Sequence, residues 1–159
     1  MKRRAILTVC FLACASVVLA APNFSGSWKI NAAKSKSGGQ FPLPQKFDRK
    51  IAHTEPVLQV TTTRSGFQGR EDFTTEAKYS TDGKETTNPG IGRSEMKSVA
   101  KWEGDILTIQ SSASTANGDF TVKERWSLSS DGKTLEVVSK VAGGFGEFES
   151  TYVLDKQPE

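Results

Sequence analysis

Hydrophobic and polar side chains alternate along most of the chain beyond residue 22. Residues 120–128 show the pattern most clearly, because Phe120, Val122, Trp126 and Leu128 fall on one side of an extended segment and polar residues fall on the other. A period of two residues predicts a β-strand with one face turned to a core. Helical periodicity is hard to find anywhere in the sequence, so the chain is predicted to be all-β.

Several other segments carry the same alternation, and short turn sequences separate them. The turns are Asp82-Gly83, 103–105, Asn117-Gly118 and Asp131-Gly132, in which glycine accepts a positive φ without penalty. The residues predicted to share the inner face are Leu58 and Val60; Phe73, Ala77 and Tyr79; Met96, Ala100 and Trp102; Leu107 and Ile109; Leu135, Val137 and Val141; and Phe148, Tyr152 and Leu154. Adjacent strands joined by tight turns form an antiparallel meander. Closing eight to ten strands into a β-barrel would remove the exposed sheet edges.

The first predicted strand carries the most specific motif. Phe24, Gly26 and Trp28 occupy alternate positions, and Phe-x-Gly-x-Trp-Lys resembles the opening strand of the calycin barrels, the lipocalins and fatty-acid-binding proteins. The resemblance implies a lipocalin-like barrel in which these three residues close one end. It also implies a basic residue over the tryptophan from the last strand, and residues 147–154 contain no arginine to fill that place.

Two features of the fatty-acid-binding proteins are absent from the sequence. Those proteins hold a carboxylate with an Arg-x-Tyr motif near the C-terminus, and here Tyr152 matches the tyrosine while Ser150 replaces the arginine. They also have a helical lid after the first strand, whereas residues 32–47 form a loop rich in glycine and proline, either a functional lid or a mobile connection. Fatty-acid specificity is therefore not implied. Residues 24–35, 102–105 and 125–133 more closely resemble the small exported lipocalin-like domains of bacteria, whose activity is generally undefined.

The N-terminus is predicted to be a cleaved signal peptide. Lys2, Arg3 and Arg4 precede a mostly apolar run, residues 5–19, and small residues allow a cut after Ala20. The alternatives are a retained membrane anchor, for which the run is short, and lipidation at Cys14. Residues 1–20 are thus the expected signal peptide and 21–159 the barrel domain, exported to the periplasm or secreted.

Charge and cysteine content exclude several functions for the exported domain. The predicted signal holds three of the 21 basic residues and none of the 18 acidic ones, so cleavage leaves 18 of each. A neutral domain with no long run of one charge has little to attract nucleic acid or an anionic membrane. Both cysteines lie in the predicted signal, so thiol catalysis is excluded. No ligand spacing for a metal and no cofactor motif is found, so none of either is expected.

A carboxylate among apolar residues marks the predicted interior. Glu124 lies in phase with Val122 and Trp126, and burying it requires a partner, water or ligand. Small polar residues at other inward positions (Thr62, Thr75, Ser98, Ser111, Ser139 and Ser150) favour a wet cavity over a packed interior. A bulge that turns Glu124 outward, or an internal salt bridge, is the structural alternative. The residues predicted to contact a ligand are Glu124, Trp126, Tyr152, Trp102, Tyr79 and Met96.

Three functions follow from these predictions. The first is an exported carrier or sensor of a small, partly apolar molecule, the only partner expected inside the barrel. The second is an envelope accessory protein that uses the loops 32–47 and 143–146 for contact. The third is a barrel enzyme with Glu124 as general acid or base, but no catalytic residue can be assigned because the single histidine, His53, is accompanied by no nucleophile.

Overall fold

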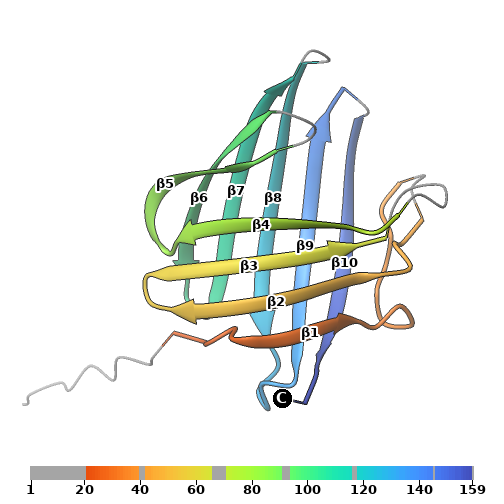
Figure 1. Ribbon diagram of the computed structural model, residues 1–159, viewed down its shortest axis with the longest axis vertical. Helices are drawn as coiled ribbons and strands as arrows, with labels where there is room; N and C mark the ends of the chain where they lie inside the picture. The colour runs from red at the N-terminus through yellow and green to blue at the C-terminus, as the bar shows by residue number, and fades with distance from the viewer. Residues whose placement is uncertain are drawn as a thin grey trace, which may run out of the picture.

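Ten antiparallel strands form one continuous sheet in the computed structural model (Figure 1). They are β1 (Gly26–Ile30), β2 (Phe47–Thr54), β3 (Val57–Arg64), β4 (Phe73–Ser80), β5 (Asp82–Pro89), β6 (Glu95–Glu103), β7 (Ile106–Thr115), β8 (Gly118–Leu128), β9 (Thr134–Gly143) and β10 (Gly146–Lys156). The structure describes residues 21–39, 42–65, 71–90, 94–115, 118–144 and 146–158, so the predicted signal peptide (1–20), Asn117 and Phe145 lie outside it. Across these ranges there is no helix long and apolar enough to cross a membrane.

The strands curl into a nearly closed barrel, as predicted. Strands neighbouring in sequence pair with one another, except that β4 does not pair with β5, and β1 pairs with β10. Figure 1 shows β1 to β4 crossing in front of β6 to β10 at a steep angle, with β5 leaving β4 at the turn and running toward β6. The closed meander therefore has one seam, between β4 and β5.

One side chain spans this seam. The backbone N–H of Lys78 on β4 donates to Oδ1 of Asn88 on β5 over 2.7 Å. Asn88 is buried, so its amide replaces the backbone carbonyl that a neighbouring strand would supply. The seam is thus bridged by a side chain where the other neighbours are joined by ladders.

Large apolar side chains fill one end of the barrel, which we call the base. Phe24 stacks on Trp102 and meets Trp126 edge to face, each with ring centroids 5.6 Å apart. The Trp28 indole N–H donates to the Phe24 carbonyl oxygen over 2.9 Å, and both residues are buried. Leu58, Leu107, Leu135 and Leu154 complete this core. Phe24 and Trp28 thus lie together in the base.

The expectation that no basic residue covers Trp28 is wrong. Strand β10 extends to Lys156, two residues beyond the predicted strand end, and Lys156 pairs with Trp28 in register. Its Nζ lies 5.5 Å from the centroid of the Trp28 ring. A Cβ on Gly26 would lie 2.8 Å from Cε of Lys156, so the missing side chain leaves room for the lysine stem. Lys156 is therefore the basic residue that covers Trp28.

The segment after β1 is fixed to the edge of β10 in its described part. Lys36 and Thr151 exchange two backbone hydrogen bonds of 2.8 Å, and the Gly38 N–H donates to the Ser150 hydroxyl over 2.9 Å. Ser35 donates from its hydroxyl to the Asn31 carbonyl and accepts from the Val153 N–H. Residues 32–47 were predicted to be either a functional lid or a mobile connection. A mobile connection does not fit residues 32–39, because this segment pairs with β10 beyond the end of β1.

Replacing Gly38 tests this attachment. A Cβ at Gly38 would overlap the carbonyl oxygen of Glu149, which is backbone and cannot rotate away. Gly38→Ala should therefore lower the free energy of unfolding by about 1–3 kcal/mol, measured by urea denaturation. The control is Lys36→Ala, which removes an exposed side chain from the same segment and should change stability by less than about 0.5 kcal/mol. Equal stabilities of the two variants would contradict the tight seating of Gly38.

Candidate ligand-binding site

The barrel encloses a cavity of about 580 Å³ beyond the packed base. One wall comes from β2, β3 and β4 and the opposite wall from β5 to β8. The lining residues are Arg49, Val60, Thr62, Arg64, Phe73, Thr75, Glu76, Ala77, Tyr79, Asn88, Pro89, Gly90, Met96, Ser111, Val122, Glu124 and Trp126. The cavity is therefore partly apolar, with charged groups among its walls.

Arg49 is the most constrained polar group of the cavity. Its side chain is only 5% exposed, and its guanidinium carbon lies 4.8 Å from the Phe47 ring centroid and 4.4 Å from that of Trp126. Nη2 donates to Oε1 of Glu124 over 2.9 Å. Nε and Nη1 are buried and have no hydrogen-bond partner within the described residues. Such orphaned donors are uncommon and need an explanation.

Glu124 points inward and is ion-paired. One carboxylate oxygen accepts from Arg49, and the other accepts from the Trp126 indole N–H over 3.0 Å. Alternation is regular along β8, so no bulge turns this side chain outward. The internal salt bridge considered as an alternative is present, and the same carboxylate also lines the cavity.

A second arginine lies beside the first. Arg64 is paired with Phe47 across β2 and β3, and its guanidinium carbon lies 4.6 Å from the Phe47 ring centroid. Burial lowers the pKa of Arg64, and the nearby charge of Arg49 lowers it further, while Tyr152 and Glu124 act in the opposite direction. Arg64 has no hydrogen-bond or ion-pair partner in the part of the chain that the structure describes. Its pKa still leaves it cationic, because an arginine stays protonated in proteins.

The remaining polar groups of the cavity are neutral hydroxyls and an amide. Burial raises the pKa of the Tyr79 phenol, so this group stays protonated. On the other wall the hydroxyls of Ser98 and Ser111 lie 2.9 Å apart, and Nδ2 of Asn88 donates weakly to Ser98 over 3.4 Å. Small polar residues thus do gather at the inner face, and Ser111 borders the cavity.

The single histidine belongs to the base. The backbone N–H of Phe24 donates to Nδ1 of His53 over 3.3 Å, so the proton lies on Nε2, which is 3.0 Å from Glu55. Glu55 also accepts from the Trp102 indole over 2.8 Å and from the Thr81 hydroxyl. His53 thus connects the end of β2 to the N-terminal segment and does not line the cavity.

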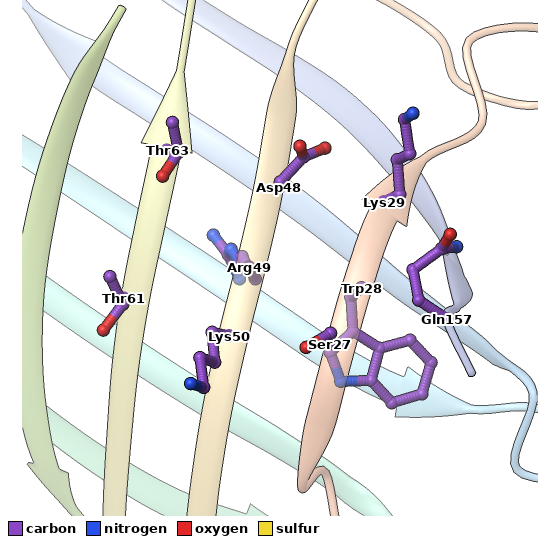
Figure 2. Close-up of a pocket in the computed structure, with 9 residues that line it drawn as sticks. All are labelled: Ser27, Trp28, Lys29, Asp48, Arg49, Lys50, Thr61, Thr63 and Gln157. Atoms are coloured by element: carbon purple, nitrogen blue, oxygen red, sulfur yellow. The ribbon is translucent and has the colours of Figure 1, made fainter. Parts of the chain in front are cut away.

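A second hollow, of about 290 Å³, lies on the outer surface over β1, β2 and β3 (Figure 2). The side chains around it include Lys29, Asp48, Lys50, Thr61 and Thr63, which point outward from their strands. Arg49 alternates with Asp48 and Lys50 and sends its guanidinium to the interior instead. We take the interior cavity as the candidate site, because its charged groups are buried and oriented by fixed partners.

Neither the cavity nor the base offers a metal site. No group of three histidine, cysteine, aspartate or glutamate side chains that could hold a metal ion occurs among the described residues.

The barrel is similar to several solved structures. Secretory abundant heat soluble protein 4 from Ramazzottius varieornatus aligns with a TM-score of 0.60 at 15% identity, covering 85% of this chain and 95% of that one. The zebrafish ileal bile-acid-binding protein complexed with cholic acid gives 0.56 at 19% identity over 84% and 98%. A REP1-NXSQ fatty acid transporter gives 0.56 at 11% identity over 86% and 97%. No protein-family model and no curated protein sequence matches the chain.

The chain shares the barrel fold of these proteins. At these identities the likeness shows the fold alone, and the site must be argued from this chain's own residues.

Four of the six residues predicted to contact a ligand line the cavity: Glu124, Trp126, Tyr79 and Met96. The other two lie elsewhere. Trp102 packs in the base, and Tyr152 packs against Phe47 with ring centroids 4.6 Å apart, outside the cavity lining.

Sequence reasoning missed Arg49 and Arg64. Arg49 is in phase with Phe47, Ile51 and His53 on the inner face of β2, so it interrupts an apolar face as Glu124 does on β8. Arg64 is in phase with Leu58 and Val60. The reasoning applied to Glu124 would have found both, had these strands been assigned residue by residue.

The Glu55 cluster predicts a pH dependence of stability. Burial alone would raise the pKa of the Glu55 carboxyl, but hydrogen bonds from Thr81, Trp102 and His53 outweigh it and hold the pKa below its usual range. A depressed folded-state pKa contributes stability that is present above the unfolded pKa and is lost as pH falls through the folded value. Glu55→Gln should therefore lose less stability than wild type between about pH 5 and pH 3.

Urea denaturation at several pH values measures this difference. The exposed Glu136 provides the control, since Glu136→Gln should keep the wild-type pH dependence. Parallel stability curves for Glu55→Gln and wild type would show that the base cluster does not depend on the charge of Glu55.

Proposed function

We propose that this barrel binds a small, partly apolar molecule in its interior cavity. The observation that carries the proposal is the cavity itself, because buried apolar side chains occupy the base of the barrel while the space beyond it stays open and partly polar. Its volume of about 580 Å³ lies within the range of small-molecule sites. An inert scaffold would gain stability by filling this space with bulky apolar side chains.

The distribution of the lining residues supports an amphipathic ligand. Val60, Ala77, Met96 and Val122 supply apolar wall, and the charged groups lie beside Trp126. The neighbours lend support of a general kind, since one is described as a fatty acid transporter and another is complexed with cholic acid. Barrels of this type thus accommodate lipophilic molecules in those proteins.

We further propose that binding takes place outside the cytoplasm, in the periplasm or the medium. The proposal rests on the basic residues Lys2, Arg3 and Arg4, the apolar run 5–19 and the small residues before position 21. Mass spectrometry of the protein from fractionated cells should find a chain that begins at Ala21 in the exported fraction. Full-length protein confined to the cytoplasm would contradict export and leave cavity binding unaffected.

Filling the cavity tests the binding function. Ala77 projects into the cavity from β4, so Ala77→Phe places a ring in the space that a ligand would use. N-phenyl-1-naphthylamine, a neutral fluorescent probe, should bind wild type, and its affinity should fall about tenfold or more in this variant. The matched control is Ala52→Phe, the same change on the exposed outer face of β2, which should bind the probe as wild type does.

Two results would contradict interior binding. One is a wild-type protein that fails to bind the probe. The other is equal loss of affinity in Ala77→Phe and Ala52→Phe, which would place the probe on the outer surface. Partner binding through the loops 32–47 or 143–146 would then become the better hypothesis.

A further inference from the structure

We propose that Arg49 and Arg64 form a subsite for the carboxylate group of an amphipathic ligand. The proposal deepens the function proposed above and rests on it, because the subsite is part of the same cavity. It names the chemical class of the ligand and the two strands, β2 and β3, that recognise it.

The charges of the cavity do not balance without a ligand. Two guanidinium groups face one inward carboxylate, Glu124, and both oxygens of that carboxylate are already engaged by Arg49 and Trp126. Glu76, the other acidic residue of the lining, lies on the outward side of β4 and is exposed, so water screens it. The positive charge of the partly buried Arg64 is therefore unmatched, and removing a charge from water is costly unless it is paired.

Hydrogen-bond donors without a partner lie beside that charge. Nε and Nη1 of Arg49 are buried without a partner, and Arg64 has no hydrogen-bond or ion-pair partner within the described ranges. The cation–π contacts to Phe47 and Trp126 account for the faces of the guanidinium groups, and Glu124 engages only Nη2 of Arg49. Guanidinium edges match the planar geometry of a carboxylate.

The two arginines are close enough to act on one group. Arg49 pairs with Thr62 and Phe47 pairs with Arg64, so the arginines are diagonal neighbours on the inner face of adjacent strands. Such positions are about 7–8 Å apart at the backbone, within reach of long side chains. The Phe47 ring contacts both guanidinium groups and fixes their orientation.

The cavity also places apolar wall near the arginines. Arg64 pairs across the strands with Phe73, which lies at the start of β4 and is 49% exposed, and Val60 pairs with Ala77 four residues back along β3. A carboxylate held by the arginines would leave Val60 and Ala77 to contact the apolar tail. The position differs from the Arg-x-Tyr of the fatty-acid-binding proteins, because Ser150 on β10 takes the place of that arginine and hydrogen-bonds Gly38 instead.

Matched ligands with and without the charge test the subsite. We expect decanoate to bind the purified protein about tenfold or more tightly than decanol in calorimetric titrations at pH 8. Arg64→Gln should weaken decanoate about tenfold and leave decanol within about threefold, since this arginine has no ion-pair partner to orphan. Arg125→Gln, which removes an exposed arginine from the outer face of β8, is the control and should bind both ligands as wild type does.

Arg49 requires a paired substitution, because its removal alone would leave Glu124 buried without its partner. The double variant Arg49→Gln, Glu124→Gln leaves the net charge of the cavity unchanged and should also lose the preference for decanoate over decanol. Thermal denaturation verifies that each variant is folded before titration.

Three results would overturn the subsite. They are equal binding of decanoate and decanol to wild type, an unchanged preference in Arg64→Gln, and tighter binding of the more highly charged decyl phosphate than of decanoate. If N-phenyl-1-naphthylamine still binds and Ala77→Phe still blocks it, only the subsite fails and interior binding stands. If the neutral probe does not bind wild type either, both proposals fall.

Discussion

The pairing of the first strand with the last makes the rest of this molecule possible. Strands β1 and β10 meet in antiparallel register, which converts a long meander into a wall with an inside and an outside. The pairing is short, and the tryptophan under Lys156, together with the Gln157 N–H bonded to Ser27, reinforces it. Without it, Phe24 and Trp28 would lose the base that they fill, and the cavity would be an open trough.

Polar side chains are unevenly distributed inside the closed barrel. The base is sealed by aromatic and leucine side chains, and its polar atoms find partners in Glu55 and in backbone groups. Beyond Trp126 the same barrel carries two arginines and one glutamate in a space that is not filled. The stack of Trp126, Arg49 and Phe47 is the boundary between these halves, and it allows a cation to lie against apolar packing.

Much of the fold could be predicted from alternation, because side chains of a barrel strand have only two directions to point. The inward set on β8, including Glu124, follows directly from its spacing. The end of β10 was placed too early because Lys156 is polar and its contact with Trp28 exists only after closure. Arg49 and Arg64 also lie at inward positions of their strands, and they were overlooked because long cationic side chains are usually solvated. The bridge from Asn88 to Lys78 depends on how β5 departs from β4, which no local pattern encodes.

The seam between β4 and β5 has a mechanical consequence. Elsewhere the circumference of the barrel is set by ladders of backbone hydrogen bonds, which must break together if neighbouring strands move apart. At the seam, away from the turn that joins the two strands, the amide of Asn88 crosses from β5 to β4 in place of a backbone ladder, and cavity-lining residues flank it on both sides. The circumference of the barrel can therefore change at this seam while the packed base keeps its shape. The wall deforms most easily beside the cavity.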